Sequence, residues 1–385
     1  MKVVFVSNYF NHHQQAFCDE MVKHLDDNFI FIATSVMRED RKQLGYGVSS
    51  KPDYVLEAHL SENDYINCCE IINTADVVIA GSVSERMLKK RIQSNLLTFR
   101  YQERLFKSNI SFARHLINSL HWLVNNPKNK NIHLLCASAY TSYDYSKIGL
   151  FKTSAYKWGY FPQTNTYDIS ELIRQKNKTK ILWCGRLIPY KHPEYAIEIA
   201  SRLKNKGYDF SLDFIGIGEL ESNLKIKVKE YNLENFVTFL GSKKPEKVRE
   251  HMEKSSIFIF TSDFEEGWGA VLNEAMNSGC AVVASHAIGS VPFLLDNKIN
   301  GLIFENGNVD NLFVKVKYLL DNPDETIKLG INAYNTISKE WNAQTAAERL
   351  LEMIREINLT GQCKLFSNGP CSKAEILRNN WFKDE

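Results

Sequence analysis

Short apolar runs alternate with longer amphipathic segments along almost the whole chain. Runs that are apolar throughout are typical of parallel strands buried on both faces, and the periodic segments between them predict covering helices. The pattern therefore predicts an α/β fold built on parallel sheets. The expected strands are Val3–Val6, Ile30–Ala33, Val77–Ala80, Leu96–Tyr101, Ile132–Cys136 and Tyr156–Tyr160, then Ile181–Cys184, Leu212–Ile215, Val237–Phe239, Ile257–Thr261, Ala281–Ala284 and Leu302–Phe304.

The strands fall into two series with a polar and charged stretch between them. The chain has 385 residues, more than one hydrophobic core usually serves, so two domains are expected. We predict an N-terminal domain over residues 1–162, a linker with a helix over 163–179 and a second domain over 180–342. The last segment, 343–385, holds a strongly periodic helix and is expected to pack back on the first domain.

Composition excludes several classes of protein and site. The net charge is only +2, which gives no global field for nucleic acid. No apolar run approaches the roughly 18–20 residues of a membrane span, and Met1–Ser7 has the pattern of a strand rather than of a signal peptide. The 8 cysteines are scattered without zinc-ligand spacing. We therefore expect a cytoplasmic protein with no metal site and no nucleic-acid partner.

Candidate chemistry concentrates in the stretch Phe264–Met276, which reads as a tight loop opening a helix between two buried strands. Gly267 and Gly269 remove side chains that would keep a ligand off the backbone, and the helix start favours an anion. Glu266 lies at the mouth of the loop and Glu274 about one turn into the helix, so both can face one ligand. Two carboxylates beside an anion site suit a molecule with a phosphate and hydroxyl groups, such as a nucleotide sugar.

The loops after two other strands of the second series carry matching groups. Arg186 and Lys191 follow one strand and can converge on a diphosphate leaving group, with bidentate geometry from Arg and a point charge from Lys. Gly185 permits a close turn beside them. Gly216 and Gly218 end the next strand, and this weak motif indicates only a tight turn near the nucleotide.

The first strand is followed by Ser7–Gln15, which lacks the Gly-x-Gly-x-x-Gly turn of a dinucleotide-binding fold. Asn11 is placed to cap the next helix, whose first turn holds His12 and His13. His13 either faces an acceptor at the sheet edge or is an ordinary surface or capping histidine. The sequence leaves both interpretations open.

The region 86–130 is strongly basic, with Glu85 and Glu103 as its acidic neighbours and apolar residues interleaved between Phe106 and Leu123. One interpretation is peripheral binding to the inner face of an anionic cell membrane, or to a phosphate-bearing acceptor. The other is a core helix with its apolar face buried and its basic face in solvent, which is the commoner arrangement.

Together these motifs resemble the retaining GT-B glycosyltransferases of glycosyltransferase family 4 (group 1), and in particular bacterial enzymes of capsule, O-antigen or exopolysaccharide assembly. The resemblance is strongest over about residues 180–357. It implies two Rossmann-like domains whose parallel sheets face an interdomain cleft, the first binding the acceptor and the second a nucleotide sugar. It also implies retaining, metal-independent transfer from a nucleotide-diphosphate sugar to a saccharide or lipid-linked saccharide in surface polysaccharide biosynthesis, without a cofactor.

The resemblance assigns roles by position. Arg186 and Lys191 would hold the diphosphate, Glu266 would contact the donor sugar, and Glu274 would bind the ribose hydroxyls. The remaining donor-site positions are Gly185, Gly216, Gly218, Gly267, Trp268 and Gly269. Many family members place a histidine after a later strand of the first domain, where this sequence reads Thr98–Glu103. Arg100 or Glu103 is the candidate for part of that acceptor-side role.

Two other functions fit the pattern less well. A nucleotide-sugar epimerase of the same fold is disfavoured by the Glu-x7-Glu element from Glu266 to Glu274. A catalytically idle nucleotide-sugar-binding or scaffolding subunit would have no need for Arg186, Lys191 and both carboxylates. No Asp-x-Asp motif occurs in the sequence, which is consistent with Arg and Lys replacing a metal ion at the leaving group.

Overall fold

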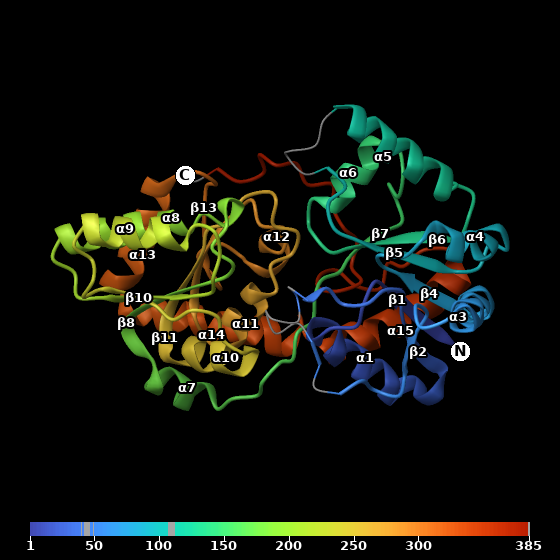
Figure 1. Cartoon of the computed structure of the whole chain (residues 1–385), viewed down its shortest axis with the longest axis horizontal. Helices are drawn as coiled ribbons and strands as arrows, with labels where there is room; N and C mark the ends of the chain where they lie inside the picture. The colour runs from blue at the N-terminus through green and yellow to red at the C-terminus, as the bar shows by residue number, and fades with distance from the viewer. Residues whose placement is uncertain (40, 42–46, 49, 107–111, 384–385) are drawn as a thin grey trace. The chain divides into compact units, whose positions relative to one another are not determined.

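The computed structural model describes residues 1–39, 41, 47–48, 50–106 and 112–383. They divide into two compact units, each built on a parallel sheet (Figure 1). The N-terminal unit comprises residues 1–163 and 342–378, and the C-terminal unit comprises residues 164–341 and the chain from Asn379 onward. Within the described ranges, every helix is too short or too polar to cross a membrane.

The described part of the N-terminal unit forms a 7-stranded sheet in the order β3-β2-β1-β4-β5-β6-β7. Its strands are β1 (Val3–Ser7), β2 (Phe29–Ala33), β3 (Val55–Glu57), β4 (Val77–Ala80), β5 (Thr98–Gln102), β6 (Ile132–Cys136) and β7 (Ala155–Lys157). Its helices are α1 (His12–Leu25), the short 3-10 helix η1 (Asp26–Asn28), α3 (Glu62–Thr74), α4 (Glu85–Gln93), α5 (Phe112–Asn125), α6 (Thr141–Lys147) and α15 (Ala343–Thr360).

Alternation along the central strands divides the N-terminal core between the two faces of the sheet. Val4 and Val6 of β1 pack with Val78 of β4 against α3 and α4. Phe5 points to the opposite face, where it meets Phe17 of α1. Helix α15 packs on α1 although more than half of the chain separates them in sequence.

The C-terminal unit has a 6-stranded parallel sheet in the order β10-β9-β8-β11-β12-β13. Its strands are β8 (Asn177–Cys184), β9 (Ser211–Ile215), β10 (Val237–Phe239), β11 (Ser255–Phe260), β12 (Ala281–Ser285) and β13 (Leu302–Phe304). The other elements are α7 (Ile169–Gln175), the 3-10 helix η2 (Pro189–Lys191), α8 (Pro193–Asn205), α9 (Glu221–Glu230), α10 (Pro245–Lys254), α11 (Val271–Asn277), α12 (Val291–Leu294), α13 (Val309–Asp321) and α14 (Pro323–Lys339).

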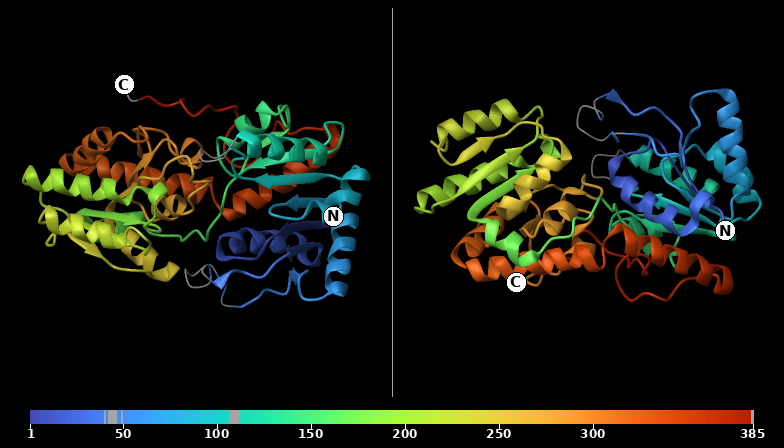
Figure 2. Two further views of the ribbon diagram at one scale, coloured as in Figure 1. Left: turned by 45° about the horizontal axis from the view of Figure 1, so that its top comes forward. Right: turned by 90° about the horizontal axis from the view of Figure 1, so that it is seen from below.

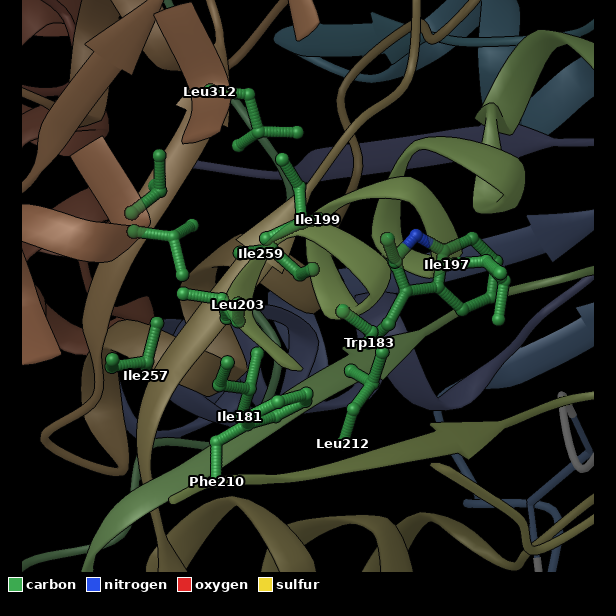
Figure 3. Packing of buried hydrophobic residues seen from close by; sticks show 14 of the residues in the cluster. Ile181, Trp183, Ile197, Ile199, Leu203, Phe210, Leu212, Ile257, Ile259 and Leu312 are labelled. Carbon is green, nitrogen blue, oxygen red and sulfur yellow. The ribbon is translucent and has the colours of Figure 1, made fainter. Parts of the chain in front are cut away.

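Helices cover both faces of the C-terminal sheet (Figure 2). On one face, Ile181 and Trp183 of β8 and Ile259 of β11 pack against Ile197 of α8 and Leu312 of α13, as Figure 3 shows. Helices α10, α11 and α14 form the layer on the other face. The strands are buried on both sides because every side chain of β11 and β12 lies under one of these layers.

All the strands expected from the sequence are present. The largest differences are in β8, which begins at Asn177 instead of Ile181, and in β7, which ends at Lys157 instead of Tyr160. The short strand β3 was not expected, because three residues carry too little periodicity to be recognised. The stretch 163–179, expected to be a linker with a helix, contains α7 as expected, but from Thr164 onward it groups with the C-terminal unit.

The final segment divides between the two units. Residues 342–378, including α15, group with the N-terminal unit, whereas the chain from Asn379 onward groups with the C-terminal unit. There the carbonyl of Asn379 lies 3.1 Å from Nε2 of His286, and the ring of Phe382 stacks on the His286 ring at 5.9 Å. Nδ1 of His286 accepts the Asn306 amide at 2.9 Å, so Nε2 is the nitrogen that donates to Asn379. The segment therefore does not pack on the first unit over its whole length.

In each sheet the first strand lies between neighbours whose connections run in opposite directions: β1 between β2 and β4, and β8 between β9 and β11. Doubly wound sheets bind ligands outside the carboxyl ends of the strands at such a point. This topology places the loops after β8 and β11 together, and those are the loops that carry the motifs found in the sequence.

Candidate active site

The loops after β8 and β9 lie against each other backbone to backbone. The amide of Gly185 donates to the carbonyl of Ile215 at 2.9 Å, and the amide of Gly216 donates to that of Gly241 at 2.9 Å. A Cβ atom on Gly216 would lie 1.8 Å from the carbonyl oxygen of Gly185, and one on Gly218 would lie 2.3 Å from that of Leu187. The glycines therefore let the β9 loop support the loop that carries Arg186 and Lys191.

Lys191 and Glu266 form a buried ion pair across β8 and β11. Lys191 Nζ donates to Glu266 Oε2, and Ser262 Oγ donates to the same oxygen at 2.9 Å. Lys191 is 8% exposed and Glu266 9%. The carbonyl of Lys191 also accepts from Thr261 Oγ1 at 2.6 Å, which ties the loop to the end of β11. Two of the predicted catalytic residues are thus brought together from different strands.

Glu274 lies in the first turn of α11, the helix that follows the loop after β11. Burial raises the pKa of its carboxyl, and the charge of Arg249 partly opposes this rise. Burial also raises the pKa of the Cys184 thiol to about 12, with Glu274 raising it further and Lys191 lowering it. Cys184 ends β8, so both charges act at the carboxyl end of this strand. Glu274 and the cation that pairs with Glu266 therefore both act at the carboxyl end of β8.

Arg186 is half-buried in the loop after β8, where its Nη2 donates to the hydroxyl of Tyr190 at 2.9 Å. The carbonyl of Tyr190 accepts the amide of Asp263 at 2.9 Å, so this loop is also joined to the loop after β11. Tyr190 therefore holds the guanidinium near the same edge of the sheet as Lys191.

Trp268 and Gly269 both pack against aromatic side chains inside the C-terminal unit. The Trp268 side chain is 1% exposed, and its indole nitrogen donates to Asn273 Oδ1 at 2.8 Å. Its ring lies 5.9 Å from that of Trp341, so the expectation that this side chain contacts the donor does not match its position in the core. Gly269 has φ +80°, and a Cβ atom there would lie 2.6 Å from the Phe260 ring. Gly267 is buried between Glu266 and Trp268, and its role in donor binding stays a prediction.

His192 joins the loops after β8 and β11 from the left-handed backbone conformation, with φ +46°. Its Nδ1 lies 2.9 Å from Glu194 Oε1 and its Nε2 lies 3.3 Å from Asp263 Oδ2. The hydrogen bond with Glu194 raises the pKa of His192, burial opposes this rise, and Asp263 adds to it. The protonated imidazolium is therefore the form that holds these two carboxylates.

We expect the His192→Asn variant to lose stability in a pH-dependent way. Because the pKa of His192 is raised on folding, its stabilising effect is complete below the unfolded pKa of about 6.5 and is lost as pH rises through the folded pKa. Asparagine tolerates the positive φ, so backbone strain is not added. The difference in Tm between wild type and variant should be a few degrees at about pH 5.5 and close to zero at about pH 9. A difference that is equal at both pH values would contradict the assigned charge.

The N-terminal unit has its own row of polar groups near the carboxyl ends of its strands. Asn11 caps α1 by accepting the His13 amide at 3.0 Å. The His13 ring stacks on Tyr160 at 6.2 Å, and the Tyr160 hydroxyl donates to Glu103 Oε1 at 2.6 Å. Burial, with a smaller effect of His12, lowers the pKa of His13 well below its usual range, so the imidazole is neutral near pH 7. The structure thus brings His13 and Glu103 together through Tyr160.

Arg100 lies elsewhere. It is 1% exposed, its Nη2 pairs with Glu85 Oε2 at 2.8 Å, and its Nε donates to Asn126 Oδ1 at 2.7 Å. The guanidinium also lies 5.6 Å from the Trp122 ring. Arg100 therefore joins α4 and the end of α5 to one face of the sheet. Its side chain does not lie at the strand ends, where the acceptor-side role was expected.

Several supporting residues were missed in the sequence. Ser262 is the second residue after β11 and could have been found by examining every polar residue near a strand end. Arg249 donates to the carbonyl of Glu274 at 3.0 Å and to Asn277 Oδ1 at 2.9 Å. It comes from α10, and no local pattern connects it to α11. Tyr160 was included only as the end of a predicted strand.

Two cationic and two acidic side chains therefore define the candidate site of the C-terminal unit: Arg186, Lys191, Glu266 and Glu274. Cations of this kind bind phosphate oxygens, and carboxylates accept hydrogen bonds from sugar hydroxyls. In the described part of the chain, no three His, Cys, Asp or Glu side chains gather closely enough to hold a metal ion.

Residues 166–336 match the family model described as glycosyl transferases group 1. A similar curated protein is the amylovoran biosynthesis glycosyltransferase AmsK of Erwinia amylovora, 26% identical over 211 residues, which are 54% of this chain and 51% of that protein. Another is the N-acetylgalactosamine-N,N'-diacetylbacillosaminyl-diphospho-undecaprenol 4-alpha-N-acetylgalactosaminyltransferase of Campylobacter jejuni, 33% identical over 176 residues, or 45% and 46% of the two chains. The chain spans about half the length of the curated relatives it matches.

Among solved structures, HepE of Anabaena in complex with UDP is similar, with a TM-score of 0.69 and 16% identity, covering 92% of this chain and 100% of that one. At this identity the likeness concerns the fold, and it confirms the α/β arrangement of GT-B type expected from the sequence. The match to the glycosyl transferases group 1 model, residues 166–336, lies within the C-terminal unit.

Proposed function

We propose that this protein is a glycosyltransferase that moves a sugar from a nucleotide-diphosphate sugar to a saccharide or lipid-linked saccharide acceptor in surface polysaccharide biosynthesis. The observation that carries the proposal is the buried Lys191–Glu266 pair at the carboxyl ends of β8 and β11, with Arg186 and Glu274 beside it. The match of residues 166–336 to the group 1 model supports it. One relative is named for amylovoran biosynthesis and another for a diphospho-undecaprenol-linked substrate, which supports this acceptor class.

In this proposal Arg186 and Lys191 bind the diphosphate, Glu266 accepts a hydrogen bond from the donor sugar and Glu274 binds the ribose hydroxyls. The Glu266 carboxylate is the anionic partner of the buried Lys191 ammonium, and it holds the ammonium at the carboxyl ends of β8 and β11. Tyr190 restrains the Arg186 guanidinium, so less freedom is lost when phosphate binds.

The reaction breaks the bond between the anomeric carbon and the phosphate oxygen and forms a bond from that carbon to the acceptor hydroxyl. Negative charge grows on the leaving diphosphate, and Arg186 and Lys191 stabilise it, which is usually the largest catalytic term. We propose that the acceptor attacks on the face from which phosphate departs, so the configuration is retained. The leaving phosphate takes the acceptor proton, so neither a strong protein base nor a metal ion is needed at this step.

On the acceptor side, we propose that His13 and Glu103 position a hydroxyl. The neutral imidazole of His13 can accept or donate one hydrogen bond, and its stacking on Tyr160 fixes the ring. Glu103 is held in turn by the Tyr160 hydroxyl. Both residues thus have restrained side chains, as substrate positioning requires.

We expect the Glu274→Gln variant to lose recognition of the ribose. Wild type should bind its nucleoside diphosphate about tenfold or more tightly than the 3′-deoxy analogue, because a hydrogen bond to a carboxylate contributes about 1.5–3 kcal/mol. The variant should bind the two analogues within about twofold of each other, measured by calorimetry. Glu246→Gln, which changes an exposed carboxylate on α10, is the matched control and should keep the full preference. Unchanged preference in Glu274→Gln would place the ribose elsewhere.

The proposed function is tested by a thermal-shift and turnover screen against UDP-, GDP-, dTDP- and CMP-sugars in EDTA. We expect one nucleotide class to raise Tm, slow nucleotide release without acceptor, and a product with the anomeric configuration of the donor. Conversion of the donor to another nucleotide sugar without acceptor would indicate an epimerase. Binding without turnover on any acceptor would indicate an idle binding subunit, and no stabilisation by any nucleotide would contradict the donor site.

A further inference from the structure

Helix α5 of the N-terminal unit carries its large apolar side chains on its outside. Ile117 is 65% exposed and Val124 75%, values that core residues do not reach. Within the helix the exposed apolar residues are Leu116, Ile117, Leu120, Leu123 and Val124. At about 100° per residue these positions form one continuous stripe along the helix.

The side of α5 opposite the stripe packs against its unit through Trp122 and the following Asn126. Trp122 lies on the side opposite the stripe, and its ring meets that of Tyr145 edge-on at 5.0 Å. The Arg100 guanidinium lies 5.6 Å from the same ring, and Asn126, just after the helix, accepts from Arg100. The apolar stripe therefore faces away from the core of its unit. The commoner arrangement expected from the sequence, with the apolar face buried, is wrong for α5.

The basic residues of region 86–130 fall into two groups, those bonded within the fold and those exposed to solvent. Residues 107–111 lie outside the described ranges. Arg91, Arg100 and Arg104 are bound within the fold: Arg91 donates to backbone carbonyls such as Ala75 at 2.6 Å, and Arg104 pairs with Asp144 at 3.3 Å. The exposed cations are Arg86, Lys89 and Lys90 on α4, Arg114 on α5 and Lys128 after it. Helix α4 begins beside α5, since Glu85 lies 3.8 Å from His121.

We propose that α5 is a membrane-docking helix, whose apolar stripe inserts into the surface of an anionic bilayer while the exposed cations of α4 and of the α5 flanks contact lipid phosphates. A helix that lies in a membrane interface combines such a stripe with a basic polar face, and α5 contains no acidic residue. Each cation near an anionic surface adds to the attraction. In the described part of the chain, α5 lies at the edge of its unit and no other helix covers its outer side (Figure 1).

A second copy of the chain is the other candidate occupant. A two-fold contact through α5 would place the same cations of both copies near one another, because the same patch meets itself. Like charges held together in this way oppose association. The charge pattern therefore favours anionic lipid over self-association.

The test is vesicle flotation of the full-length protein with phosphatidylcholine vesicles, with and without phosphatidylglycerol. Wild type is expected to bind the anionic vesicles at least about tenfold more strongly than the neutral ones, and less strongly at high salt. The double variant Ile117→Ser with Leu120→Ser should lose at least about tenfold of this binding. The matched control, Ile226→Ser with Val314→Ser, removes two similarly exposed residues of the C-terminal unit, 54% and 60% exposed, and should bind like wild type.

Because the altered side chains are exposed, both double variants should melt close to wild type. Equal vesicle binding by wild type and the α5 variant, or no preference for anionic vesicles, would overturn the proposal. So would a dimer in sedimentation velocity that the α5 substitutions dissociate while vesicles leave wild type unbound. Nucleotide turnover plays no part in this readout, so failure here leaves the proposed transferase activity untouched.

Discussion

Replacing Lys191 with methionine is expected to lower turnover by about 100- to 1,000-fold, the usual loss when one group that stabilises the transition-state charge is removed. Lys191 is the cation that the structure fixes most firmly at this edge, through Glu266 and through its own carbonyl. Initial rates at saturating donor measure the effect. Turnover within about threefold of wild type would remove Lys191 from the leaving-group role.

A structural effect of the same substitution must be separated from the catalytic one. Lys191→Met leaves the Glu266 carboxylate buried without its cation, a loss of about 3–5 kcal/mol of stability. The double variant Lys191→Met with Glu266→Gln removes both charges and should recover much of the Tm. Its turnover should stay as low as that of the single variant, because the missing cation is not restored.

The matched control is a second lysine–carboxylate pair of the C-terminal sheet, whose lysine lies on β8 itself. Lys180 Nζ lies 2.6 Å from Asp213 Oδ2, between β8 and β9. It is not at the carboxyl end of the strand, since β8 continues to Cys184. Lys180→Met should therefore change turnover by less than about threefold.

The second large effect is expected for Gly216→Ala, a loss of at least about 3 kcal/mol and roughly 6–12 °C in Tm for a domain of this size. The new Cβ atom would lie 1.8 Å from the Gly185 carbonyl oxygen, and φ is +135°. Relief requires the β8 and β9 loops to separate, which also displaces Arg186. Thermal unfolding and donor affinity should therefore decline together.

Gly207→Ala isolates the backbone contribution. Gly207 also has a positive φ, +77°, but no atom lies within 4 Å of its added Cβ. The expected loss is about 1–2 kcal/mol, from backbone conformation alone. If both variants melted alike, close packing of the two loops would not be the reason for glycine at position 216.

Most of the fold was predictable because parallel strands buried on both faces are apolar throughout. Strand β11 and strand β12 are buried at every position and were recognised almost to their ends. Strand β3 is three residues long and partly exposed, so it left no pattern. The return of the chain from Asn379 to the C-terminal unit depends on contacts with His286, far away in sequence, which local periodicity does not contain.

The candidate site was predictable only where strand ends determine position. Lys191 and Glu266 follow adjacent strands, so their meeting follows from the sheet order. Arg100 lies two residues before the end of β5, and its side chain occupies a sheet face rather than the edge. Trp268 packs on Trp341, a distant partner that local sequence does not indicate. For α5, periodicity predicted a stripe but not which side of the helix meets the core.

We propose that the carboxyl ends of β8 and β11 bind a nucleoside diphosphate through Arg186 and Lys191 without a metal ion. Its most direct test is calorimetric titration, in EDTA, of wild type and Lys191→Met with Glu266→Gln, using the nucleoside diphosphate found in the screen. We expect wild type to bind, and the folded double variant to bind at least about tenfold more weakly, because a charge-assisted hydrogen bond is lost. Equal affinity of the two proteins, or wild-type binding that disappears in EDTA, would contradict it.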